Sequence, residues 1–133
     1  MTPSDEARRL LRKADQDRAV FHAIKNQPGI DAEAACFHAQ QAVEKSLKAV
    51  LLAKGVSFRR THDLDELVDR ILDEGLAFPF PSDHFSPLTP CAVHLRYDDL
   101  EIEGLPLADA ERMMEEVRRW AGEVVEGGSG MGL

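Results

Sequence analysis

The chain has 133 residues, of which 44% are hydrophobic and 30% charged, and its formal net charge is −8. Length and composition predict a single globular domain, and no apolar run approaches the roughly eighteen residues of a membrane span. The charged N-terminus predicts no secretory signal, and the acidic balance excludes a protein that coats nucleic acid without selectivity.

Charge is unevenly distributed along the sequence. Residues 4–26 carry six basic and four acidic side chains, and residues 31–60 carry five and three. In contrast, residues 61–75 have a net charge of −5 and residues 98–126 one of −7. A local phosphate site is therefore expected only in the first half of the chain.

The first two predicted helices span about 4–26 and 31–54. Thr2 or Ser4 is expected to cap the first helix, and Gly55 ends the second. Small residues on the second helix would let another helix approach closely, which predicts a place at the centre of a bundle or at a dimer seam. We expect a homodimer. These small residues are Ala39, Ala42, Ala49 and Ala53.

The second half of the chain predicts a third helix over about 63–75, with Asp63 and Glu66 resembling a capping box. A short extra helix follows over about 86–96, and Pro106 opens the last long helix. The predicted fold class is all-α: an up-and-down four-helix bundle with one short extra helix. Its single domain covers 1–126, and a flexible Gly/Ser-rich tail covers 127–133.

Two cysteines occur, Cys36 and Cys91. Without a secretory signal, reduced thiols and a cytoplasmic location are expected, with a disulfide as the minor alternative. Metal-binding spacings such as HxH, HxxxH and CxxC are absent, as are phosphate-binding glycine-rich loops. No cofactor is expected.

The second helix carries an unusual polar face. Its members recur at spacings of three and four residues, opposite an apolar stripe. An anion could be held here by two ammonium groups and an amide, with an imidazole one turn away. The alternative is an exposed face of solvated charges, in which Glu44 and Lys48 form an ordinary ion pair. The face consists of His38, Gln41, Lys45 and Lys48.

Two further elements complete the candidate site. His62 lies before the third helix and follows Arg59 and Arg60, so it could join them in a phosphate pocket or only hydrogen-bond the backbone. Arg96 and Tyr97 could bring a cation and a hydroxyl towards the second helix. They could equally form a buried ion pair and a packing anchor.

These three segments resemble the HEPN family (higher eukaryotes and prokaryotes nucleotide-binding). The family pattern HAxQAxEKxLKAxL is matched by residues 38–51, THxL by 61–64, and Arg-Tyr-Pro by Arg96-Tyr97, although Asp98 replaces the proline. The resemblance covers roughly residues 5–125. It implies a helical bundle that binds nucleotide through His38, Gln41, Lys45, Lys48, His62, Arg96 and Tyr97.

The resemblance also implies partners and activities. Non-catalytic members often accompany a minimal nucleotidyltransferase, in an arrangement like a toxin–antitoxin system, and the ligand would be an ATP- or AMP-like nucleotide or RNA. Ribonuclease members carry an Arg-x4–6-His motif, which this sequence lacks. A non-catalytic nucleotide-binding module is therefore favoured, and no catalytic residue is assigned. The alternatives are a metal-independent endoribonuclease and a ligand-free helical dimerisation protein.

Overall fold

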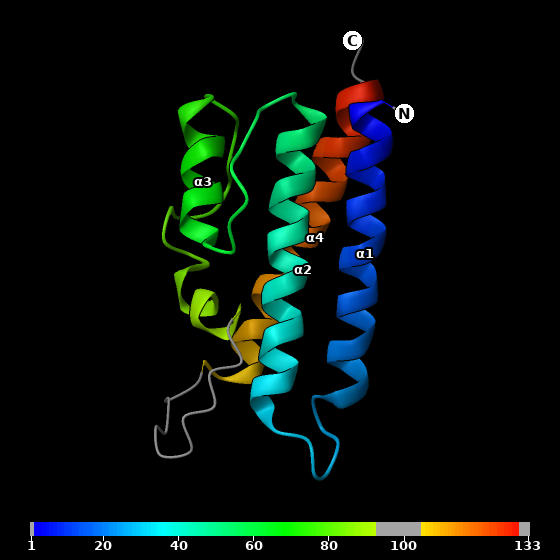
Figure 1. The fold of residues 1–133 in the computed structure, drawn as a ribbon, viewed down its shortest axis with the longest axis vertical. Coiled ribbons are helices and arrows are strands. Elements are labelled where there is room, and N and C mark those ends of the chain that lie inside the picture. Colours follow the sequence, from blue (N-terminus) through cyan, green and yellow to red (C-terminus); the bar gives the residue numbers. More distant parts are fainter. Residues whose placement is uncertain (1, 93–104, 131–133) are drawn as a thin grey trace.

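The computed structural model describes residues 2–92 and 105–130, and all regular secondary structure within these ranges is helical. The expected all-α bundle is thereby confirmed (Figure 1). No helix in these ranges is long and apolar enough to cross a membrane. The elements are α1 (Pro3–Ile24), α2 (Ala32–Ala53), α3 (Leu64–Asp73), the 3₁₀ helix η1 (Ser86–Ala92) and α4 (Leu107–Gly130).

Local sequence signals explain where the helices begin and end. Thr2 caps α1 in a reciprocal capping box, in which Asp5 N–H donates to the Thr2 hydroxyl and Thr2 N–H donates to the Asp5 carboxylate. After α2, Gly55 adopts a φ of 70°, and Val56 N–H donates back to the Leu51 carbonyl at 2.9 Å. This arrangement is a Schellman motif, and it requires the left-handed conformation that glycine adopts easily.

The helix directions depart from strict alternation. α2 is antiparallel to α1, whereas α3 and α4 both run in the same direction as α2 (Figure 1). The segment 54–63 contains no helix and runs back along the bundle from the end of α2. Consequently α3 starts near the middle of α2 and runs in the direction opposite to this segment. An extended chain rises about twice as far per residue as a helix, which lets this short segment span the required distance.

The centre of the bundle is α2, which contacts α1, α3, η1 and α4. Its small residues Ala39, Ala42 and Ala49 are fully buried within the single chain. They permit close approach of α1 and α4, as expected for a central helix. Around them lies one continuous core whose largest fully buried side chains include Phe21, Leu47, Phe85, Leu88 and Met114.

Two sequence-based expectations about helix ends differ from the structure. α4 continues to Gly130, four residues into the segment expected to be a flexible tail. Glycine disfavours a helix by about 1 kcal/mol relative to alanine but does not prevent an established helix from continuing. The expected capping box of α3 is wrong: Asp63 accepts from Asp65 N–H at 3.0 Å, while Glu66 pairs with Arg59. The short extra helix is η1, and its expected continuation beyond residue 92 lies outside the described ranges.

The expectation of two reduced thiols is wrong. Cys36 on α2 and Cys91 on η1 form a disulfide, with their Cα atoms 5.7 Å apart. Phe85 and Leu88 are fully buried, and the packing of this segment brings η1 against α2 and Cys91 beside Cys36. The two cysteines are 55 positions apart in sequence, so this proximity depends on tertiary packing.

Candidate functional site

The polar face of α2 is built around two buried carboxylates. The first is Asp17 on α1, whose Oδ1 lies 3.0 Å from His38 Nδ1 and whose Oδ2 accepts from Lys45 Nζ. Asp17 is only 9% exposed. A buried carboxylate needs charged or hydrogen-bonding partners, so Asp17 fixes both α2 side chains in place.

Glu44 is the second buried carboxylate, and its side chain is 6% exposed. Its Oε2 accepts from Lys48 Nζ at 3.0 Å, and its Oε1 lies 2.9 Å from His62 Nδ1. Gln40 Nε2 also donates to Oε1, at 3.2 Å. Glu44 therefore joins the middle of α2 to the turn that precedes α3.

Two glutamines extend this network. Gln40 Nε2 donates to the His62 carbonyl at 3.1 Å, and Gln41 Nε2 donates to Gln40 Oε1 at 2.7 Å. Gln40 is fully buried. Because α2 thus engages both the backbone and the ring of His62, the position of that turn relative to α2 is fixed.

The structure thus places five of the seven predicted site residues in two neighbouring networks along α2, one on Asp17 and one on Glu44. We call His38, Gln41, Lys45, Lys48 and His62, together with Asp17, Gln40 and Glu44, the α2 cluster. Arg96 and Tyr97 lie outside the described residues.

Of the two arginines expected beside His62, Arg59 is paired with an acidic residue of α3. Arg59 makes a bidentate ion pair with Glu66, with both N–O distances at 2.7 Å, although the Arg59 side chain is 76% exposed. This hydrogen bonding raises the pKa of Arg59 and lowers the pKa of Glu66. Arg60 is exposed. A pocket that uses Arg59 would have to compete with Glu66.

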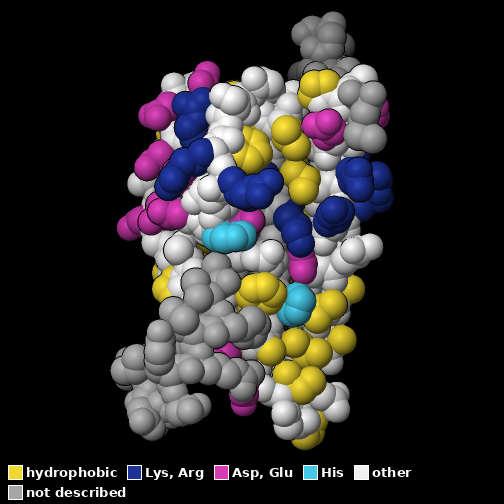
Figure 2. All heavy atoms as spheres, in the orientation of Figure 1, with side chains coloured by type: hydrophobic (Ala, Val, Ile, Leu, Met, Phe, Trp, Pro, Cys, Tyr) yellow, Lys and Arg dark blue, Asp and Glu magenta, His cyan; other side chains and the backbone are white. Residues whose placement is uncertain are grey.

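The charges of the α2 cluster are balanced in a way that leaves donors available. Two carboxylates face two ammonium groups and two imidazoles, so the cluster is neutral when both histidines are neutral and positive when they are protonated. Each ammonium has three donors, and Asp17 or Glu44 accepts one of them. Figure 2 shows Lys, Arg and His side chains gathered over α2 in the middle of this face.

Accessibility within the α2 cluster is graded. The side chain of His62 is 68% exposed, whereas that of Lys48 is 16% exposed. His62 Nδ1 faces Glu44, so Nε2 lies on the opposite side of the ring. The arrangement can therefore present fixed N–H donors to an anion at its outer edge without moving the buried carboxylates.

Sequence reasoning missed Asp17 and Gln40 and treated Glu44 as an ordinary surface partner. One signal could have found Asp17: it lies three residues after Ala14 and four before Phe21, on the apolar stripe of α1. An acidic residue at such a position must have a partner from another element. Glu44 likewise follows Gln40 by four residues on the buried side of α2.

Ion pairs also join α1 to α4, with basic and acidic residues contributed by both helices. Arg18 donates to both Asp15 and Glu115, while Arg118 donates to Asp15 at 2.8 and 3.0 Å. Partial burial alone would raise the pKa of Asp15 and of Glu115. Hydrogen bonds from Arg118 and Arg18 to Asp15, and from Arg18 and His22 to Glu115, outweigh burial and lower both pKa values. Within the described residues, three glutamates of α4 thus pair with α1 and its C-cap residue rather than with the α2 cluster: Glu111, Glu115 and Glu126.

Potential metal-binding side chains in the described residues do not form a metal centre. No group of three His, Cys, Asp or Glu side chains there is arranged to hold a metal ion. Each histidine of the α2 cluster instead faces a carboxylate that is engaged by a lysine.

Comparisons with known proteins point to one family. The family model described as HEPN domain matches residues 7–127. The crystal structure of an archaeal HEPN homologue resembles this chain with a TM-score of 0.53 and 20% sequence identity, over 94% of this chain and 98% of that chain. At this identity the likeness supports the fold alone. None of the curated proteins compared with the chain matches it.

Proposed function

The chain belongs to the HEPN domain family, and on this basis we propose that it is a non-catalytic nucleotide-binding module. The α2 cluster would hold the phosphate of an ATP- or AMP-like nucleotide. One observation carries the proposal: residues of α2 and of the turn before α3 converge on two buried carboxylates at an open face.

The ion pairs within the cluster favour this role physically. Free lysine side chains lose rotamer entropy when they grip a ligand, whereas Lys45 and Lys48 are already held by Asp17 and Glu44. Their remaining N–H donors, together with His62, could then bind phosphate oxygens through charge-assisted hydrogen bonds. The carboxylates make the site selective, because a ligand must satisfy donors without approaching the buried acids.

The proposed partner is a minimal nucleotidyltransferase, in a cytoplasmic system of the toxin–antitoxin kind. The sequence lacks the Arg-x4–6-His motif of ribonuclease members, which favours a binding role over catalysis. Nucleotide chemistry would then come from the partner polypeptide. We also propose a homodimer, which light scattering on the purified chain would detect as a doubled mass. A monomeric mass across the accessible concentration range would reject the dimer without affecting the nucleotide site.

Calorimetric titration of the nuclease-free protein with AMP and ATP tests the nucleotide site. Lys45→Ala and His62→Ala should each weaken binding about tenfold or more, since each removes a charge-assisted contact. His62 is largely exposed, so its substitution spares the core. The matched control is Lys13→Ala, which removes an exposed lysine of α1. Wild-type affinity in both cluster variants, or no binding by the wild type, would refute the site.

One observation favours a second candidate, a metal-independent endoribonuclease. His38 and His62 each face a buried carboxylate through Nδ1, an arrangement that orients imidazoles for proton transfer. Incubating the protein with a short RNA and analysing the ends of any fragments tests this candidate. Cleavage that disappears in His62→Ala and persists in Lys13→Ala would favour the nuclease, and intact RNA would reject it.

A further inference from the structure

A basic groove lies between α1 and α4, on residues that the α2 cluster does not use. Its volume is about 590 Å³, and guanidinium groups line it from both helices. The carboxylates that line it are fewer, so it is locally positive on a chain with a net charge of −8. The lining charges are Arg8, Arg12, Arg118, Arg119, Glu123 and Glu126.

Gly122 allows Arg118 to lie along the surface of α4. A Cβ atom at position 122 would come within 2.7 Å of Arg118 Nη1. Arg118 donates to Asp15 through Nε and Nη2, so Nη1 is the part of the guanidinium that lies over Gly122. Arg118 is thereby fixed in the groove with donor capacity remaining.

Arg12 and Arg119 carry the uncompensated charge of the groove. Both are exposed, and neither makes an ion pair or hydrogen bond with any residue in the described ranges. Arg8, by contrast, is shared between Asp5 and Glu126. Unpaired guanidinium groups on two facing helices suit phosphate oxygens, which they bind with two parallel hydrogen bonds.

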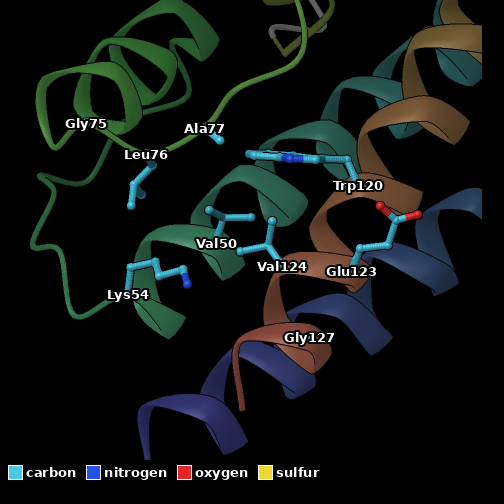
Figure 3. Close-up of a pocket in the computed structure, with 9 residues that line it drawn as sticks. All are labelled: Val50, Lys54, Gly75, Leu76, Ala77, Trp120, Glu123, Val124 and Gly127. Carbon is cyan, nitrogen blue, oxygen red and sulfur yellow. The ribbon is translucent and has the colours of Figure 1, made fainter. Parts of the chain in front are cut away.

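A second hollow, of about 570 Å³, adjoins the groove at Glu123, which lines both. Figure 3 shows the indole ring of Trp120 edge-on, extending from α4 with Val50 and Val124 on one side of it. Lys54 and Glu123 stand on opposite walls of this hollow. An aromatic plane beside aliphatic side chains suits a flat nucleobase. Stacking of this kind does not depend on the nucleotide sequence, because every base has a flat aromatic face.

We propose that the C-terminal half of α4 binds single-stranded nucleic acid. Two phosphates lie on Arg12 and Arg119, and a base enters the hollow beside Trp120. Trp120 is partly buried against Phe78 and Phe80, and its remaining surface lines the hollow. The combination of guanidinium groups with this partly exposed ring selects a strand with unstacked bases over an acidic peptide or a duplex. Glu123, between the two hollows, repels the backbone and limits affinity.

Fluorescence anisotropy with a labelled, unstructured oligouridylate tests the proposal. The double variant Arg12→Gln/Arg119→Gln should bind about tenfold or more weakly than wild type. Its logarithmic salt dependence should flatten by roughly 1.4, about 0.7 for each phosphate that the variant no longer neutralises. Arg9→Gln/Lys13→Gln is the matched control, because it removes two exposed cations of α1 outside the groove. Glu123→Gln should bind more tightly than wild type.

The single tryptophan reports the base contact independently. Saturation with the oligouridylate should change Trp120 fluorescence, and the corresponding DNA should bind as well as RNA because no 2′-hydroxyl contact is assigned. An equal fall in affinity in the control variant would show that binding depends only on the overall charge of the protein, and it would overturn the proposal. Three other results would also overturn the proposal. These are unchanged Trp120 fluorescence, displacement of the oligouridylate by polyglutamate as effectively as by unlabelled RNA, and no binding by the wild type. The α2 cluster is tested separately with mononucleotides.

Discussion

Replacing Glu44 by glutamine should destabilise the fold although the side chains have nearly the same size. The carboxylate is 6% exposed and has three partners: Lys48, His62 and Gln40. Glutamine keeps one acceptor oxygen but places an N–H group where the second oxygen accepts from Lys48. The substitution therefore leaves the ammonium of Lys48, whose side chain is 16% exposed, without its counter-ion.

The magnitude follows from the burial of the two partners. Breaking a fully buried ion pair costs about 3–5 kcal/mol, and hydrogen bonds to charged groups contribute about 1.5–3 kcal/mol. Lys48 retains some contact with water and His62 is 68% exposed, so the loss should be smaller than for a fully buried ion pair and close to that of a hydrogen bond to a charged group. We expect the free energy of unfolding to fall by about 2 kcal/mol. For a domain of this size, Tm should drop by about 6–10 °C.

Urea unfolding followed by far-UV circular dichroism measures this change. Glu123→Gln is the control, because Glu123 is exposed on α4, and it should change stability by less than about 0.5 kcal/mol. A double-mutant cycle with Lys48→Met should give a coupling free energy of about 1–2 kcal/mol between the two side chains. If Glu44→Gln costs no more than the control, or the two cluster substitutions are additive, the buried network does not stabilise the fold.

Three other predictions concern stability. Cys91→Ser should lower the free energy of unfolding by about 2–4 kcal/mol, because the disulfide closes a loop over 55 positions; a urea midpoint that a reductant does not shift would contradict this. Asp15 and Glu115 have lowered pKa values in the fold, so the stability they provide is complete above their ordinary pKa values of 3.8 and 4.5 and is lost as pH falls below them. Glu115→Gln should therefore flatten the acid dependence of Tm, and a slope equal to that of wild type would count against the α1–α4 ion pairs. Ala42→Leu should cost at least about 2 kcal/mol by overpacking the bundle centre, whereas Ala32→Leu at the exposed start of α2 should have little effect in the same assay.

Much of the fold could be predicted because its signals are local. Thr2 marks the start of α1 and Gly55 the end of α2, since capping and positive φ depend on neighbouring residues alone. The disulfide could not be predicted, because its cysteines meet only after η1 packs against α2. The direction of α3 depends similarly on the path of segment 54–63 along the bundle, which no local pattern specifies.

Of the candidate site, the residues on α2 could be predicted, but the carboxylate that α1 contributes could not. The spacing of His38, Gln41 and Lys45 places them on one face of a helix, and this holds in the fold. The carboxylate that anchors the face, Asp17, comes from another helix. Without knowledge of how α1 packs on α2, Lys45 is indistinguishable from a solvated lysine, so its ion pair with Asp17 had to come from the structure.

Mapping AMP binding by NMR tests the central claim most directly. Backbone amide resonances of the isotope-labelled protein would be followed during a titration with AMP. Our account predicts saturable shifts concentrated in residues 38–48 and 61–63, and their disappearance in Lys45→Ala but not in Lys13→Ala. Shifts concentrated instead in residues 8–12 and 118–123, or no saturable shifts at all, would contradict a nucleotide site in the α2 cluster.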